Sequence, residues 1–340
     1  MARMSREIRL AARPTGLPKE SDFELAEVEV GAPKEGQLLV ENVYMSVDPY
    51  MRGRMNDVRS YAPPFQIGEP LDGGAVGHVI ESRHSGFEAG DFVMSLMAWR
   101  EAFLSDGGGL RKVDGKVAPL SAYLGALGGP GLTAYGALLD IGAPKEGETV
   151  FVSGAAGAVG SLAGQIARIK GCRVVGSAGT DEKVRFLRDE LGFDAAFNYR
   201  SGPLREALAE HAPDGVDIYF DNVGGDHLEA ALHAMRPHGR IIACGMISQY
   251  NETEPPPGPN NLILIVTKSL TMRGFLTGQY FDRLADFLRD MSGWLSEGRV
   301  HVRETIAEGI ESAPRAFIGL LEGANTGKML VRLSPEPDPR

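Results

Sequence analysis

The feature that most constrains the fold is a glycine-rich turn set between two apolar, β-branched runs. The first run, TVFV, covers 149–152, the turn carries Gly154, Gly157 and Gly160, and the second run begins at Cys172. A segment of helical pattern lies between the turn and the second run. This order of strand, turn, helix and strand predicts a βαβ unit, and it places this part of the chain in the α/β class.

The same alternation continues further along the chain. Helical patterns at 181–192 and 226–239 alternate with strand patterns at 215–225 and 240–248. Before Tyr123, by contrast, short apolar runs are separated by Gly and Pro, which is typical of a small barrel or sandwich. With 340 residues, of which 43% are hydrophobic, the chain is long enough for these two patterns to form two domains.

Composition argues against several classes of protein. The formal net charge is −10 and no block of Lys or Arg stands out, so we expect no nucleic-acid partner. No window has the roughly 18 apolar residues of a membrane span, and the first residues lack the apolar core of a signal peptide. Two cysteines, Cys172 and Cys244, are too few for a disulfide framework or a structural zinc cluster. We therefore expect a cytoplasmic protein with no membrane partner.

The glycine turn has the pattern of a phosphate cradle. Free N–H groups at the start of a helix point at an anion there, and glycines let the backbone approach a pyrophosphate closely. The rival phosphate loop needs Gly-Lys followed by Ser or Thr, whereas Gly327-Lys328 is followed by Met329. Two alternatives remain open, a tight turn that binds no ligand and an adenosyl site of the methyltransferase type.

The end of the second strand favours NADP(H) over NAD. An NAD site usually carries Asp or Glu at this position, but the sequence has Ser177, Ala178 and Gly179, with Lys183 one helical turn later. A neutral strand end beside a cation suits a ribose that carries a 2′-phosphate. The acids at 181–182 argue mildly the other way, although acids are common in the first turn of a helix.

Several longer runs carry a resemblance to a known family. They are SVDPYMRGRM (46–55), GPGLTAYGAL, GAAGAVGSLAGQIARIKGCRVVGSAGTDEK, FNYR, YFDNVGG, CGMISQYN, MRGF and ANTGK. With these runs the chain resembles the zinc-free medium-chain dehydrogenases/reductases, in particular the prostaglandin reductase/leukotriene B4 dehydrogenase group of NADPH-dependent double-bond reductases. The resemblance implies a homodimer. It also implies a GroES-like catalytic domain of residues 1–122 and 300–340, and a Rossmann domain of residues 123–299.

The resemblance also implies a set of cofactor-binding residues. The pyrophosphate would meet the glycine turn, the adenosine 2′-phosphate the ends of two strands, and the nicotinamide half the segments after the later strands. In that order the residues are Gly157, Ala158, Val159, Gly160; Ser177, Gly179, Lys183, Tyr199; Asn222, Cys244, Gly245, Met246, Ile247, Ser248, Gln249, Tyr250, Phe275, Leu276, Thr277; and Asn325 from the tail. One position departs from the family pattern, because Gly129 stands where a larger apolar residue such as Met is expected, which implies a wider pocket.

Zinc dehydrogenases of this fold hold a catalytic metal with Cys and His ligands, but the corresponding segment here reads MSVDPY, with Ser46. We therefore predict no metal site and a reaction that needs none, namely reduction of an activated C=C bond. Hydride addition to the β-carbon of an enone or enal leaves an enolate, which needs an oxyanion partner and a proton. A tyrosine is protonated at neutral pH, and Tyr250 and Tyr50 are the candidate catalytic donors.

Other interpretations stay open at this point. Either tyrosine could be a packed residue whose hydroxyl is satisfied inside the fold. The scaffold would also suit an NADPH-dependent quinone oxidoreductase, which needs no proton donor at position 250. A third possibility is a protein that binds NADPH without turning over a substrate.

Overall fold

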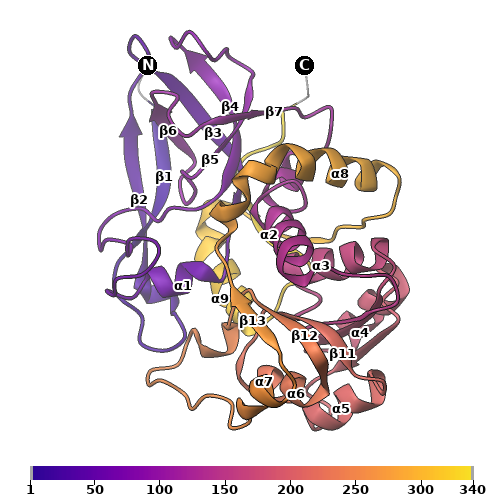
Figure 1. Cartoon of the computed structure of the whole chain (residues 1–340). Helices are drawn as coiled ribbons and strands as arrows, with labels where there is room; N and C mark the ends of the chain where they lie inside the picture. The colour runs from indigo at the N-terminus through magenta and orange to yellow at the C-terminus, as the bar shows by residue number, and fades with distance from the viewer. Residues whose placement is uncertain (1–2, 338–340) are drawn as a thin grey trace. The chain divides into compact units, whose positions relative to one another are not determined.

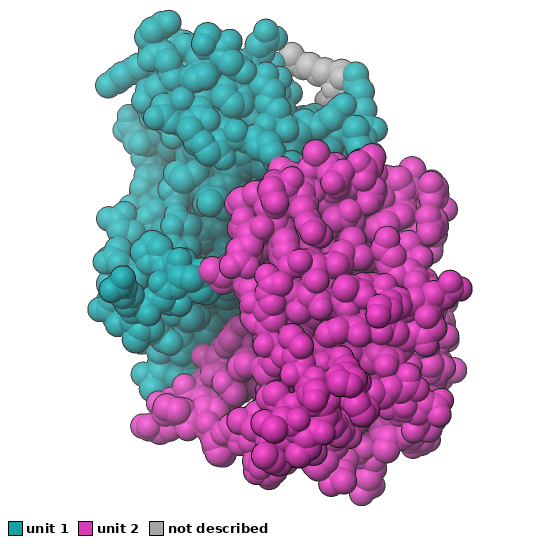
Figure 2. All heavy atoms as spheres, in the orientation of Figure 1, with its two compact units in different colours: residues 1–124, 304–325, 329–340 teal, residues 125–303, 326–328 magenta. Residues whose placement is uncertain are grey.

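The computed structural model describes residues 3–337, which form two compact units (Figures 1 and 2). Unit 1 consists of 1–124, 304–325 and 329–340, and unit 2 of 125–303 and 326–328; Figure 2 draws them in teal and magenta. Unit 1 is rich in β-strands and unit 2 contains a parallel sheet, so the predicted α/β class is confirmed.

Unit 1 is built from antiparallel strands. A two-stranded sheet pairs the first two strands, and a seven-stranded sheet has the order β14-β15-β3-β4-β5-β7, with β6 also pairing with β3. The central strand β3 runs antiparallel to β4, β6 and β15. The strands are β1 (Arg3–Leu10), β2 (Phe23–Val30), β3 (Leu38–Ser46), β4 (Ala75–Ser82), β5 (Phe92–Ser95), β6 (Ala102–Ser105), β7 (Arg111–Val113), β14 (Glu304–Glu308) and β15 (Lys328–Arg332).

The core of unit 1 contains residues from both the N-terminal and the C-terminal parts of the chain. Trp99 is fully buried, stacks on Phe23 at 5.8 Å between ring centroids and meets Phe317 edge-on at 6.1 Å. Phe317 lies on α9, which the sequence analysis did not predict, and neither β1 nor β14 was predicted. The helical segments are η1 (Glu20–Asp22), α1 (Tyr50–Arg54), η2 (Leu120–Leu124), η7 (Ile310–Ser312) and α9 (Ala313–Glu322).

Unit 2 contains a six-stranded parallel sheet of order β10-β9-β8-β11-β12-β13. The order reverses direction between β8 and β11, and in such sheets a ligand binds outside the carboxyl ends of the strands at this point. Figure 1 shows β11, β12 and β13 side by side. The strands are β8 (Thr149–Val152), β9 (Arg173–Ala178), β10 (Ala195–Asn198), β11 (Val216–Asp221), β12 (Met235–Ala243) and β13 (Thr271–Gly274).

Alternate residues of each strand face opposite sides of the sheet. Because these strand residues are largely apolar, helices pack against the sheet and bury them. On one side Phe151, Tyr219 and Ile241 pack in a single core with Leu208 of α5 and Leu228 of α6. The helices of unit 2 are α2 (Gly129–Ala137), α3 (Ala158–Ile169), α4 (Asp181–Arg185), α5 (Leu204–His211), α6 (Gly225–Ala234), α7 (Ile263–Thr267) and α8 (Leu284–Ser296). Shorter helical turns are η3 (Leu138–Gly142), η4 (Phe186–Glu190), η5 (Ile247–Gln249) and η6 (Thr277–Arg283).

Two predicted elements in unit 2 have other boundaries in the structure, and the strand expected over 240–248 runs from Met235 to Ala243. The helix expected over 226–239 ends at Ala234, and β12 begins at Met235. Pro237 gives the physical reason, because proline has no N–H to donate and disfavours a helical conformation in the residue before it.

Candidate active site

The glycine turn joins β8 to α3 as the sequence predicted. Gly157 is the N-cap of α3, and Gly154 has a φ of +57°, a conformation that favours glycine. A side chain at Gly160 would place its Cβ 2.5 Å from the carbonyl oxygen of Gly154, so only glycine lets the helix approach the turn this closely. The N–H groups in the first turn of a helix have no partner within it, and they form a site for an anion.

The tail of the chain reaches this turn. The Gly327 N–H donates to the carbonyl of Ala156 at 2.8 Å, and Gly327 forms a parallel bridge with Gly157. Gly327 has a φ of +71°, and a Cβ there would lie 1.8 Å from the carbonyl oxygen of Arg303, so this position also requires glycine. Asn325, which comes just before this segment, is buried. Asn325 was predicted as a site residue, whereas the pairing of Gly327 with the turn was not predicted.

The end of β9 and the segment after β10 lie together. Tyr199 donates its backbone N–H to the carbonyl of Ala178 at 3.1 Å, and its hydroxyl lies 3.2 Å from the position of a Cβ on Gly179. Ser177 is fully buried, and its hydroxyl has no hydrogen-bond partner among residues 3–337. Three of the predicted adenosine-side residues therefore lie where the ends of β9 and β10 meet.

Two positively charged side chains, Lys183 and Arg200, lie near the end of β9. The Lys183 N–H donates to the Thr180 hydroxyl at 3.3 Å, where Thr180 caps α4. Burial, followed by the nearby positive charge of Arg200, lowers the pKa of Lys183. The Nε of Arg200 lies 3.5 Å from the Cβ position of Gly179, and its guanidinium carbon is 5.6 Å from the centre of the Tyr199 ring. Arg200 was not predicted as a site residue, although the run FNYR contains it.

Ser153 links the ends of β8 and β11. Its hydroxyl accepts the backbone N–H of Asn222 at 3.0 Å, and its carbonyl accepts the Asn222 side-chain amide at 2.8 Å. Asp221 is fully buried, and its Oδ1 accepts from Ser153, Tyr219, Val223 and Gly224 at 2.7–3.2 Å. Burial raises the pKa of Asp221, while these donors oppose the shift. This network fixes the backbone on which Asn222 sits.

The segment after β12 folds against the same network. The N–H groups of Cys244 and Gly245 both donate to the carbonyl of Asp221, and the Ser248 hydroxyl donates to the carbonyl of Val223 at 2.6 Å. Burial, followed by the charge of Asp221, raises the pKa of the Cys244 thiol to about 12. The backbone of this segment is therefore held by β11 rather than by the residues of its own strand.

Tyr250 is the last residue of this segment, and its hydroxyl oxygen lies against the backbone of the same segment. The Met246 N–H donates to the Tyr250 oxygen at 3.3 Å, and a Cβ on Gly245 would lie 3.1 Å from that oxygen. Ile247 and Gln249, which lie between them, form the turn η5, where Gln249 donates its N–H to the Met246 carbonyl at 2.9 Å. A tyrosine hydroxyl can act both as an acceptor and as a donor of hydrogen bonds.

The segment after β13 contacts α2. Thr133 Oγ1 lies 2.7 Å from Thr277 Oγ1 and 2.8 Å from the carbonyl oxygen of Gly129. Gly129 is exposed, and a Cβ there would meet no atom within 4 Å. Leu276 is 45% exposed, and Phe275 packs on Tyr280 at 5.6 Å between ring centres. The departure at Gly129 therefore leaves open space one helical turn from Thr133.

Tyr50 belongs to unit 1. It is the first residue of α1 rather than part of a turn, and its side chain is 36% exposed. Desolvation, followed by the charge of Asp48, raises the pKa of Tyr50, so it stays protonated at neutral pH. The other candidate donor, Tyr250, belongs to unit 2.

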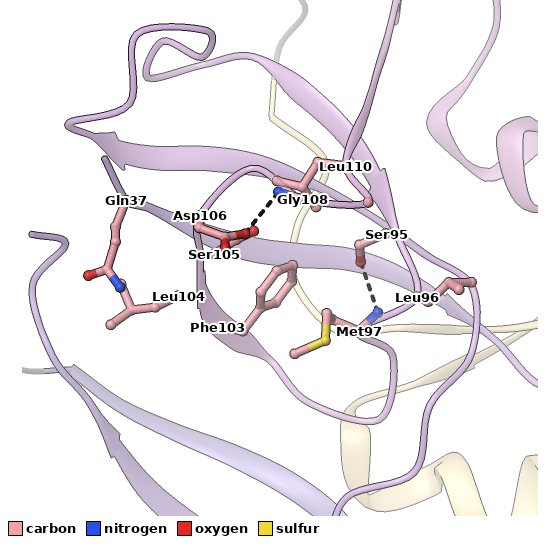
Figure 3. Close-up of a pocket in the computed structure, with 11 residues that line it drawn as sticks. Gln37, Ser95, Leu96, Met97, Phe103, Leu104, Ser105, Asp106, Gly108 and Leu110 are labelled. Atoms are coloured by element: carbon pink, nitrogen blue, oxygen red, sulfur yellow. Dashed lines mark hydrogen bonds between the residues drawn. The ribbon is translucent and has the colours of Figure 1, made fainter. Parts of the chain in front are cut away.

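Unit 1 contains a pocket of about 460 Å³ that involves none of the predicted site residues (Figure 3). Its polar groups bond within their own turns, as when the Gly108 N–H donates to Asp106 at 2.9 Å. In the part of the chain that the structure describes, no three or more His, Cys, Asp or Glu side chains form a group able to hold a metal ion. Within the same residues, no helix is both long and apolar enough to cross a membrane.

The order of the parallel strands and the glycine turn define unit 2 as a Rossmann-type nucleotide-binding unit. Comparison with known families agrees with this class. A family described as "N-terminal domain of oxidoreductase" matches residues 6–113, and one described as "Zinc-binding dehydrogenase" matches residues 158–293.

Close relatives identify the family. The NADPH-dependent curcumin reductase of Escherichia coli is 46% identical, over 96% of both chains, and rat prostaglandin reductase 1 is 46% identical, over 93% of this chain and 95% of its own. The crystal structure of CurA from Vibrio vulnificus in complex with NADPH covers 97% of this chain and 100% of its own, at 45% identity and a TM-score of 0.93. The chain belongs to the medium-chain dehydrogenase/reductase family, in the prostaglandin reductase group that its motifs resemble.

Proposed function

We propose that this protein is an NADPH-dependent reductase that acts on the C=C bond of α,β-unsaturated aldehydes and ketones. The observation that carries the proposal is Tyr250, whose oxygen accepts the Met246 N–H at the carboxyl edge of a nucleotide-binding sheet. The names of the related curcumin and prostaglandin reductases support it, as does the NADPH complex of the related CurA. Unit 1 is the GroES-like catalytic domain, and unit 2 binds the cofactor.

The residues of unit 2 fit a nucleotide with a 2′-phosphate. The turn at 154–160 offers a helix N-terminus to the pyrophosphate, and a side chain at Gly160 would close that approach. Lys183, Tyr199 and Arg200 provide two positive charges and a hydroxyl for the 2′-phosphate, and no acid lies between Ser177 and Thr180. Asn222, the segments at 244–250 and 275–277, and Asn325 hold the nicotinamide half. When bound, NADPH supplies the hydride.

Residues of the chain stabilise the negative charge that hydride transfer creates on the substrate. Hydride addition to the β-carbon moves the electron pair of the C=C bond onto the enolate oxygen, and a proton must then reach the α-carbon. Tyr250 donates a hydrogen bond to that oxygen, or its proton to the carbon, while its own oxygen accepts from Met246. Tyr50 is the alternative candidate for this donor.

A substrate panel tests the proposal. Purified protein is mixed with NADPH and, separately, with alkenals, aryl enones, prostaglandin-like enones and quinones, and NADPH absorbance is followed. We expect oxidation with the enals and enones and a product saturated at the α,β-bond. Turnover of quinones alone would identify a quinone oxidoreductase, and cofactor binding with no turnover of any member would identify a non-catalytic NADPH-binding protein.

We further propose a homodimer formed at the outer edge of β13. This strand is the last of its sheet and pairs only with β12, so its other edge can receive a strand of a second copy. Exposed apolar side chains lie on both sides of it in the chain, including Ile263 (64% exposed), Val266 (72%) and Phe281 (66%). Sedimentation velocity should give a dimer for the wild type and a monomer for Ile263→Asp/Val266→Asp.

The proposed compartment is the cytoplasm. Cys172 and Cys244 form no disulfide, which suits a reducing compartment. Fractionation of the source cells, with immunodetection of the chain in each fraction, tests this assignment; recovery from an oxidising compartment would contradict it.

A further inference from the structure

His227 is a buried histidine that the proposed reaction does not use. It lies in the first turn of α6 and is only 4% exposed. Its ring centre is 4.9 Å from that of Tyr199, with an angle of 75° between the planes, so one ring presents its edge to the face of the other. The two residues come from different elements, because Tyr199 directly follows β10.

The chemistry of this imidazole is that of a neutral ring. Burial lowers the pKa of His227 to about 4, with the neighbouring Asp226 opposing the shift, so the ring carries no charge at neutral pH. Its Nε2 is buried and has no hydrogen-bond partner among residues 3–337. An unpaired buried nitrogen costs stability, and no hydrogen bond at Nε2 offsets that cost.

Tyr199 connects this ring to the proposed 2′-phosphate site. One part of Tyr199 packs against the apolar core that includes Leu228 of α6, and its hydroxyl lies near Gly179 at the end of β9. Arg200 follows directly and lies 5.6 Å from the same ring. A change of the Tyr199 side-chain rotamer about χ1 would therefore move both the hydroxyl and the contact of Arg200.

We propose that His227 is a positioning residue for NADPH selectivity, whose imidazole packs against the Tyr199 ring and holds that side chain in the χ1 rotamer that directs its hydroxyl toward the 2′-phosphate. The proposal rests on the NADPH specificity proposed above. NADH has no 2′-phosphate, so its binding does not depend on that hydroxyl. A ring of similar shape without nitrogen atoms should do the same work.

The test compares NADPH and NADH affinities, measured by fluorescence titration, in the wild type, His227→Leu and His227→Phe. Loss of one aromatic pair in His227→Leu should raise the Kd for NADPH roughly three- to tenfold, and leave that for NADH within about twofold. His227→Phe should keep the wild-type ratio. In a Tyr199→Leu background, His227→Leu should have no further effect on the ratio, because the ring that it positions is gone.

The outcomes distinguish a failure of the proposed NADPH specificity from a failure of the positioning role of His227. A wild type that binds both cofactors equally would refute the NADPH specificity, and with it this role of His227. A selective wild type whose ratio is unchanged in His227→Leu would overturn the positioning role alone, as would equal losses for both cofactors. Should His227→Leu fail to fold, His227→Phe decides, because loss of NADPH selectivity in a folded Phe variant contradicts a role that depends on ring shape.

Discussion

The two ends of the proposed cofactor site use opposite electrostatics. At the β9 end, Lys183 and Arg200 place two positive charges beside a strand end without acids, and Arg200 is exposed to solvent. At the β12 end the ionisable groups are kept neutral or buried. The thiol of Cys244 has a pKa raised to about 12, and Asp221 is fully buried with its pKa raised.

The difference shows how one sheet edge can separate binding from chemistry. The cations would recognise a charge that is present in the bound cofactor throughout the reaction, so they should act on affinity. The neutral Tyr250 hydroxyl would meet a charge that exists only after hydride transfer, so it should act on rate. Substitutions at the two ends should therefore move different measured quantities.

The largest effect is expected at the charged end. Lys183→Ala removes a charge-assisted hydrogen bond to the 2′-phosphate, which is typically worth about 1.5–3 kcal/mol, or roughly ten- to a hundredfold in Kd. Arg200→Ala should have a smaller effect in the same direction, because this side chain is more exposed. Titration of NADPH and NADH, followed by fluorescence, measures both.

Arg185→Ala is the matched control for these variants. Arg185 is an exposed cation in the last turn of the same helix, and it should leave both affinities unchanged. If Lys183→Ala weakens NADPH and NADH equally, Lys183 does not read the 2′-phosphate, and the electrostatic contrast between the two ends loses its functional meaning.

The next effect is expected at the neutral end. Tyr250→Phe keeps the ring and deletes the hydroxyl that accepts from Met246, so single-turnover NADPH oxidation with a saturating enone should slow by on the order of tenfold. This is less than a full oxyanion donor is worth, because a ribose hydroxyl of the cofactor could also donate to the enolate oxygen. The Kd for NADPH should stay within about twofold of the wild type, since the interaction exists mainly in the transition state.

A wild-type rate in Tyr250→Phe would move the donor elsewhere and make Tyr50→Phe the next variant. If both variants kept the full rate, solvent or the cofactor itself would stabilise the enolate. The assignment of tyrosine chemistry to the neutral end would then be wrong, while the charged end would be unaffected.

The sequence predicted local patterns well and long-range pairing poorly. The βαβ unit around 149–178 follows from glycine spacing and β-branched runs that lie close together in the chain. The bridge between Gly157 and Gly327 has no such local signal, because the two residues are far apart in sequence and meet only when the tail returns. Strand β1 was missed for a related reason, since MSREIRL alternates only weakly and gains its place by pairing with β2.

In the candidate site, too, local features were predicted and long-range contacts were not. Lys183 was predicted from its distance to a strand end without acids, and Tyr250 from its place after a strand. The sequence could not show that Arg200 lies beside Gly179, that Asp221 organises the segment 244–250, or that His227 meets Tyr199. Each of these depends on which strands are neighbours in the sheet, and the strand order is not written in any single segment.

A smaller effect should sharpen the description of the neutral end. Gly129 begins α2, and a Cβ there meets no atom within 4 Å, so Gly129→Met should fold with a melting temperature close to that of the wild type. If this position faces the substrate, the added side chain should raise KM for bulky aryl enones a few-fold and leave KM for small alkenals unchanged, as one misplaced apolar group does. Equal KM values for both substrate sizes in the variant would place Gly129 outside the pocket.

Removal of metal ions is expected to have no effect on rate or stability. The family that matches 158–293 is described as a zinc-binding dehydrogenase, yet Ser46 stands in the segment where a cysteine ligand would be expected, and its hydroxyl donates to Asp48 at 2.5 Å. His78 lies 3.7 Å from Glu41, a pair that is too small to hold zinc without further ligands. Prolonged treatment with a strong chelator should therefore leave the enone-reduction rate and the melting temperature unchanged, and elemental analysis should find far less than one zinc per chain. One zinc per chain, with activity lost on its removal and restored on its return, would contradict this prediction. A Lewis acid would then share the enolate with Tyr250, and the end described here as neutral would carry the strongest charge in the site.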